Sequence, residues 1–113
     1  MNEEEQTLSE GMPDFSGLLA QAQEMQAQMA AAQQQLAEER LIGRAGGGLV
    51  TATVTGAGEL IGLTVEPAAA DPGDTETLAD LVLAAYRDAS NQALQRQSET
   101  MGPLASGLEL PGM

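Results

Sequence analysis

Residues 46–67, GGGLVTATVTGAGELIGLTVEP, decide the fold of this chain. Apolar residues and threonines alternate in VTATVT at 50–55, the period-two pattern of a strand with one buried face. A Gly-Ala-Gly turn at 56–58 follows, and a second alternating run ends at Pro67. The stretch therefore predicts an antiparallel hairpin in the middle of the chain, too small and too poor in reactive side chains for an enzyme.

A strand and a bend are expected just before this hairpin. The segment RLIGR at 40–44 predicts a short strand with Leu41 as its apolar anchor, and three glycines at 46–48 separate it from the hairpin. Such glycines can cradle a phosphate. No lysine follows them, however, and no helix is expected to begin there. We interpret them as a tight bend with positive φ, a conformation that glycine adopts without steric strain.

A long helix is expected before the strands. Pro13-Asp14 marks its start, with Asp14 as the N-cap. Apolar residues then recur at spacings of four and three, as in a heptad seam: Leu18, Ala22, Met25, Met29, Ala32 and Leu36. Two interpretations stay open: the helix lies on the protein's own sheet, or its seam also pairs with a partner subunit. With Val50 and Val54, the seam forms the predicted core and dimer surface.

A second long helix is expected after the strands. Asp74 is its predicted N-cap, and Glu76 in the first turn complements the helix dipole. One face of the helix is apolar and carries Leu78, Leu81, Val82, Ala85, Ala89 and Ala93. Gly102-Pro103 is expected to stop the helix after about Met101.

These elements predict an α+β fold, an α-β-β-β-α protomer with a small antiparallel sheet and two long helices. Residues 1–12 are expected to be a disordered acidic arm, 13–101 the folded domain, and 102–113 a flexible tail. The chain has only two aromatic residues, and many of its hydrophobic residues are alanines. A core of this kind is thin, and small domains with thin cores often gain stability by forming oligomers.

The composition excludes most catalytic and metal chemistry. The chain has no cysteine, histidine or lysine, so it lacks thiol nucleophiles, disulfides and the usual zinc ligands. The acidic residues at 71, 74 and 76 do not have the spacing of an EF-hand loop. We therefore expect no enzyme activity, no metal and no cofactor.

Charge is unevenly distributed over the chain, whose net charge is -13. Residues 1–39 hold eight acidic residues and no base, whereas Arg40 and Arg44 balance Glu59 and Glu66 in the middle segment. Acidity of this size favours solubility and repels nucleic acid over large surfaces. No signal peptide and no apolar run of ~18–20 residues is present, so a cytoplasmic protein without membrane contact is expected.

Three blocks of sequence carry a family resemblance. The first expected helix is rich in glutamine and methionine, LLAQAQEMQAQMAAAQQQL. The middle block has the form GxGLVxxxVxG followed by an acidic-Pro pair, in Gly46, Gly48, Leu49, Val50, Val54, Gly56, Val65, Glu66 and Pro67. The second helix carries LxDLVxAAxxDA, in Leu78, Asp80, Leu81, Val82, Ala84, Ala85, Asp88 and Ala89. In this order the blocks resemble the YbaB/EbfC family of small bacterial nucleoid-associated proteins, over nearly the full chain after the acidic arm.

This resemblance implies a homodimer whose sheets join across the interface and whose long helices project as arms. It also implies binding to double-stranded DNA in the nucleoid with little sequence preference and a change in DNA conformation. The candidate DNA-binding residues are Arg40, Arg44, Gln26 and Gln33.

The first helix departs from the family, whose members commonly have Lys and Arg among its Gln and Met positions. A dimer that uses both arginines offers about four phosphate contacts, so weak and salt-sensitive DNA binding is expected. The alternative is an acidic homodimeric interaction module, including the case of a DNA mimic, that has lost DNA binding. Such a module would bind a protein through the Gln/Met helix face.

Overall fold

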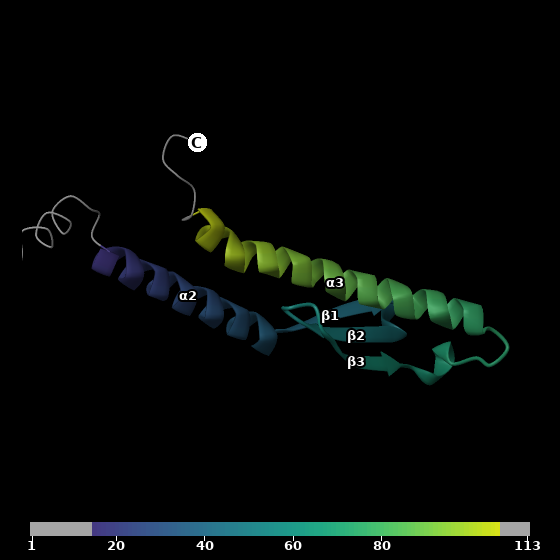
Figure 1. Ribbon diagram of the computed structural model, residues 1–113. Coiled ribbons are helices and arrows are strands. Elements are labelled where there is room, and N and C mark those ends of the chain that lie inside the picture. The colour runs from purple at the N-terminus through teal and green to yellow at the C-terminus, as the bar shows by residue number, and fades with distance from the viewer. Residues whose placement is uncertain (1–14, 107–113) are drawn as a thin grey trace, which may run out of the picture.

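The computed structural model describes residues 15–106 (Figure 1). The elements follow in the order α2 (Phe15–Glu38), β1 (Arg40–Ala45), β2 (Val50–Thr55), β3 (Leu60–Val65) and α3 (Thr75–Ser106). Short 3-10 turns at Gly46–Gly48 and Pro67–Ala69 follow β1 and β3. The predicted α+β fold and its α-β-β-β-α order are confirmed.

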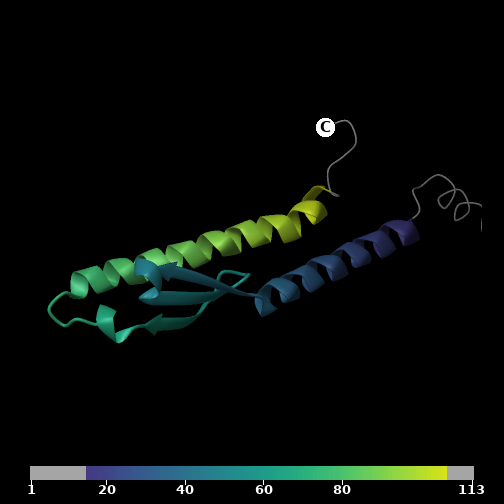
Figure 2. The ribbon, with the colours of Figure 1, turned by 180° about the vertical axis from the view of Figure 1, so that it is seen from behind.

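The three strands form one antiparallel sheet in the order β1-β2-β3. Helix α3 lies across one face of this sheet and contacts β1 and β2 (Figures 1 and 2). The bend between β1 and β2 has positive φ at Gly46, Gly47 and Gly48, as the sequence predicted. An L-residue is strained in that conformation, which is why glycine occupies all three positions.

The core is built from small side chains on facing surfaces of β2 and α3. Its most buried members, at most 1% exposed, are Val50, Ala52, Val54, Ala85, Ala89 and Ala93. Small residues let the helix approach the sheet closely, and Gly43 of β1 completes this approach. A Cβ at Gly43 would lie only 2.9 Å from the Ala89 Cα. The predicted core positions Val50 and Val54 are confirmed.

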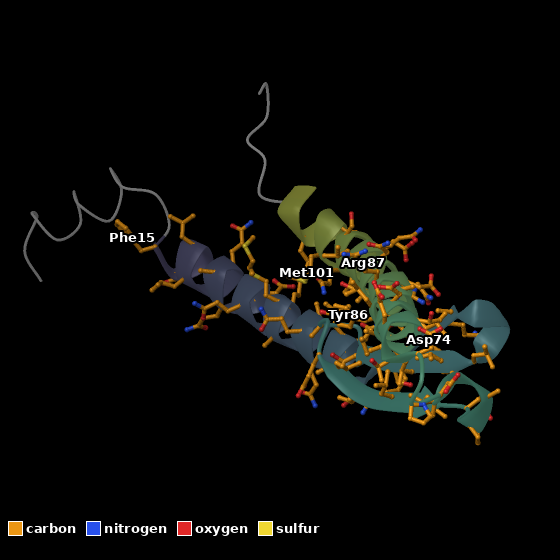
Figure 3. The ribbon with its side chains drawn as sticks, turned by 90° about the vertical axis from the view of Figure 1, so that its right-hand side faces the viewer. Phe15, Asp74, Tyr86, Arg87 and Met101 are labelled. Carbon is orange, nitrogen blue, oxygen red and sulfur yellow. The ribbon has the colours of Figure 1, made fainter. Side chains whose placement is uncertain are left out.

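Helix α2 does not lie on the sheet of its own chain, so that interpretation of its seam is wrong. The helix extends away from the sheet, and Phe15 projects at its far end (Figures 1 and 3). Only Ala32 and Leu36 are buried, at the end that contacts α3 and β2. Met25 is half-buried, whereas the remaining seam residues Leu18, Ala22 and Met29 are exposed. The partner-pairing interpretation stays a prediction.

The end of α3 differs from the prediction. The helix continues through Gly102 and Pro103 to Ser106, so the expected stop at Gly102-Pro103 is wrong. Proline lacks an N–H group and therefore removes one helical hydrogen bond. It lies only one turn before the helix end, where few later bonds depend on it. The domain boundaries at 12 and 102 remain predictions, and Asp14, the expected cap of α2, lies outside the described residues.

Asp74 caps α3, as predicted from the sequence. The Thr77 hydroxyl donates to Asp74 Oδ2 at 2.7 Å, and the Thr77 N–H donates to Asp74 Oδ1 at 3.2 Å. Both bonds favour the charged carboxylate, so they hold the pKa of Asp74 below its ordinary value of 3.8. The cap satisfies a backbone donor that the first helical turn leaves without a partner.

This lowered pKa predicts how the cap responds to pH. Because the folded pKa is below the unfolded one, the cap stabilises the protein above the unfolded pKa and loses this effect as the pH falls through the folded value. We expect Asp74→Ala to lower the melting temperature at neutral pH, and Asp74→Asn, which keeps an acceptor, to lower it less. Circular-dichroism melts should show the Asp74→Ala difference shrinking as the pH is lowered below 3.8; a difference that does not change with pH would contradict this role.

Candidate nucleic-acid interface

Arg40 and Arg44 lie on the face of the sheet opposite α3. Side chains of β1 alternate, and Arg40, Ile42 and Arg44 are exposed whereas Gly43 and Ala45 are buried toward the helix. The structure thus places the two predicted basic residues on one surface, with Ile42 between them. We call this surface the open face of the sheet.

Threonines continue the open face across the other strands. Arg44 is directly opposite Thr51 of β2, and Thr51 is directly opposite Thr64 of β3. Thr53 lies on the same face, opposite Ile42. Directly opposed residues of antiparallel strands share one face of a sheet, so the arginine row is followed by rows of hydroxyl groups.

The open face is also where positive charge is concentrated. The three strands contain two arginines and no acidic residue. Helix α2 has acidic residues and no base, and α3 has four acidic residues against Arg87 and Arg96. Within residues 15–106 the sheet is therefore the element with a net positive charge.

The two arginines have different local roles. Arg40 Nη1 donates to the carbonyl oxygens of Ala37 and Glu39, at 2.9 Å and 3.0 Å, so this side chain also caps the end of α2. The Arg44 guanidinium makes no ion pair or hydrogen bond with any other described residue. Arg44 is consequently the better placed of the two to contact a phosphate.

The predicted glutamines are not part of this cluster. Gln26 and Gln33 are exposed and seven residues apart on one flank of α2. Gln26 precedes Arg40 by 14 positions, which corresponds to about 20 Å along a helix. They can extend a contact surface along α2, but they do not join the arginines in one site.

Two residues outside the predicted site contact the edge of β1. Asp88, which the sequence marks only as part of the second-helix block, accepts a hydrogen bond from the Arg44 N–H at 3.0 Å. Gln92 donates to the Ile42 carbonyl oxygen at 2.8 Å. Only the spacing of four between 88 and 92 hinted that both lie on one side of a helix.

An apolar surface lies beside the sheet, on the α3 side of β3. A shallow hollow there is lined by Leu60, Ala79, Val82, Leu83 and Tyr86. Leu60 and Leu83 are 47% and 45% exposed, and Leu63 of β3 is 46% exposed. Tyr86 and Arg87 follow each other in the middle of α3 (Figure 3). The hollow exists because α3 covers β1 and β2 but leaves β3 uncovered.

Two other kinds of structural feature bear on function: a membrane-spanning helix and a carboxylate cluster. Neither helix in residues 15–106 is long and apolar enough to cross a membrane. In the same range, no group of three or more carboxylates is placed to hold a metal ion.

Comparisons with known proteins agree with the fold and with the resemblance. Residues 12–108 match the model of the YbaB/EbfC DNA-binding family. A nucleoid-associated protein of Rhodococcus jostii is 56% identical over 106 residues, covering 91% of this chain and 94% of that protein. One of Streptomyces griseus is 57% identical over 98 residues, covering 87% of this chain and 86% of that protein.

Similarity to a solved structure gives independent support for the fold, and for the fold only. The crystal structure of an uncharacterized protein from Helicobacter pylori has a TM-score of 0.73 to this chain at 19% identity, covering 83% of this chain and 99% of that one. The family match covers most of the sequence, and both relatives are more than half identical to it over the aligned residues. The chain belongs to the YbaB/EbfC DNA-binding family.

Proposed function

We propose that this protein is a nucleoid-associated protein of the bacterial cytoplasm that binds double-stranded DNA as a homodimer. Family membership and the names of the relatives support DNA as the partner. The observation that carries the proposal is the open face, where Arg40 and Arg44 lie together on strands that have no acidic residue.

The chemistry of the open face favours contacts to the DNA backbone over the reading of bases. Its groups are two guanidiniums and a few threonine hydroxyls, and all of these bind phosphate oxygens well. Across its three strands, the open face has only two guanidiniums and no amide side chain, so it can contact few base edges. We therefore propose binding with little sequence preference, in which contact along the backbone alters the conformation of the DNA.

A homodimer provides the second half of this contact surface. We propose that the hollow beside β3 is covered by the same hollow of a second copy, since a twofold interface joins identical patches. Leu60, Leu63 and Leu83 are about half exposed in one protomer, and a shared apolar contact completes their burial. The dimer then carries two copies of the open face and up to four arginines.

DNA affinity is expected to be steeply dependent on salt. Each phosphate neutralised in duplex DNA contributes about −0.9 to the slope of log K against log salt concentration. Two Arg44 side chains alone give a slope of about −2, and all four arginines give about −3.6. With the full set, raising salt from about 50 to 200 mM weakens binding roughly 150-fold.

Fluorescence anisotropy of a labelled duplex, titrated at several salt concentrations, tests this proposal. We expect saturable binding for the unchanged protein and at least about a tenfold loss for Arg44→Ala, with a slope smaller by about 2. Arg40→Ala should lose less, because part of that guanidinium already binds the end of α2. Arg87→Ala is the matched control: it removes one exposed charge from α3 and should change the affinity little.

The acidic interaction module predicts the opposite results. In that case the unchanged protein shows no DNA binding even at about 50 mM salt, where counterion release favours binding most. Equal losses for Arg44→Ala and Arg87→Ala would locate binding away from the open face. The family match favours the DNA-binding interpretation over this alternative.

A further inference from the structure

Strand β1 is an edge strand, but two backbone groups on its outer edge are bonded by side chains of α3. The sheet order leaves one side of β1 and one side of β3 without a neighbouring strand. An edge strand presents unpaired N–H and C=O groups that can bind a strand of another molecule. In β1, two such groups belong to Ile42 and Arg44, and both are already bonded.

The α3 side chain is the acceptor in one of these bonds and the donor in the other. The Asp88 carboxylate accepts from the Arg44 N–H, and the Gln92 amide donates to the Ile42 carbonyl oxygen. The two partners of the first bond are 44 positions apart in sequence, and those of the second are 50 positions apart. Asp88 and Gln92 are one helical turn apart, which matches the two-residue step from Arg44 back to Ile42 along the strand.

Gly43, between these two strand residues, makes the arrangement possible. It has no Cβ, so the backbone of α3 around Ala85 and Ala89 comes close enough for the next turns of the helix to reach over the strand. One turn beyond Gln92, Arg96 Nε lies 3.1 Å from Glu39 Oε2. That oxygen is buried and makes no hydrogen bond among the described residues, so the ion pair is its compensating contact.

Strand β3 has no equivalent cover in the described residues. Its inner edge pairs with β2, and none of the side-chain hydrogen bonds within residues 15–106 involves a group of β3. The two edges of the sheet are therefore unequal: two backbone groups of the β1 edge are bonded by α3 side chains, whereas no such bond is made to β3 within residues 15–106.

We propose that Asp88 and Gln92 form an edge guard that restricts self-association of this protein to its β3 side. A sheet with two open edges can join β3 of one copy to β1 of the next, which is a head-to-tail contact that need not close. With β1 guarded, only identical β3-side surfaces can meet, and such a contact closes after two copies. This inference goes beyond the proposed homodimer, because it concerns what prevents further growth.

Sedimentation velocity of a double variant, Asp88→Ala/Gln92→Ala, over a wide range of concentration tests the guard. We expect a series of species that grows with concentration, whereas the unchanged protein shows one limiting size. The matched control is Asp80→Ala/Gln95→Ala, which makes the same chemical changes at exposed positions of α3 and should behave like the unchanged protein. A folded guard variant that sediments like the control at every concentration would overturn the proposal.

Two additional measurements keep the test decisive if the double variant does not fold. Asp88→Asn keeps an acceptor for the Arg44 N–H and should retain the limiting size, whereas Gln92→Glu removes the donor at equal volume and should lose it. Amide hydrogen exchange on the unchanged protein should show a protected Arg44 N–H; rapid exchange there would contradict the guard. If the unchanged protein is a monomer, only the proposed homodimer is refuted. The guard is still tested, because it depends on whether the guard variant forms larger species than the unchanged protein does.

Discussion

Replacing Gly43 with alanine is expected to destabilise the protein by about 3 kcal/mol or more, at the upper end of the range for overpacking a closely packed contact. A Cβ at this position meets backbone atoms of Ala85 and Ala89, not flexible side-chain ends. The helix backbone has to move away as a unit, and this separates β1 from α3. A loss of this size is a large part of the roughly 5–15 kcal/mol that stabilises a typical domain.

Gly62→Ala is the control for this substitution. Gly62 is also a strand glycine, in β3, but a Cβ there would lie 3.5 Å from the Thr53 Cβ, an ordinary van der Waals distance. Removing the conformational freedom of a strand glycine stabilises by about 0.5–1 kcal/mol, so Gly62→Ala should be neutral or slightly stabilising. Both variants are compared by urea unfolding at one fixed protein concentration. An unfolding midpoint for Gly43→Ala equal to that of the unchanged protein would show that α3 does not pack closely on β1 at this position.

The double substitution Leu60→Asp/Leu83→Asp is expected to weaken the proposed dimer by at least about a thousandfold. Completing the burial of a half-exposed leucine is worth about 1 kcal/mol, which is half of the value for full burial. A twofold interface contains four of these leucines, so about 4 kcal/mol is lost, and each 1.4 kcal/mol is a factor of ten. Unpaired carboxylates in an apolar contact add a further cost.

Sedimentation equilibrium measures this effect directly. The matched control, Leu19→Asp/Leu94→Asp, adds the same charge at two leucines that are 62% and 60% exposed and lie outside the hollow. It should leave the dimer unchanged. Dissociation in the control but not in the test variant would move the interface to the helical arms, as the partner-pairing interpretation of the α2 seam predicts. The monomeric test variant should also bind DNA more weakly, because each particle then carries half as many arginines.

The sequence predicted those parts of the fold that depend on local pattern. Alternation at Val50 and Val54, the Gly46–Gly48 bend and the Asp74 cap each follow from the preferences of a few adjacent residues, and all are confirmed. It failed where a local preference competes with the rest of the chain. Gly102 and Pro103 are a strong stop signal, yet α3 continues past them, and Leu104 lines a groove shared with Met25 of α2.

The candidate site was predicted only in part, for a similar reason. Arg40 and Arg44 were identified as the bases of the middle segment, and the period of two already implied that they share a face of β1. Which face remains open was decided by α3, which packs on the opposite side through Gly43. Gln26 and Gln33 were proposed by resemblance, and the structure leaves them at a distance along α2.

By itself, the sequence determined the kind and order of the elements, the family and the location of the few positive charges. Each of these depends on short stretches of neighbouring residues. The tertiary structure alone decided that α2 leaves the sheet and that β3 stays uncovered. It also decided that Asp88 and Gln92 close the edge of β1. The contacts at the β1 edge join residues 44 and 50 positions apart. Such pairs meet only after the helix has packed on the sheet, and no local pattern specifies the distance between them.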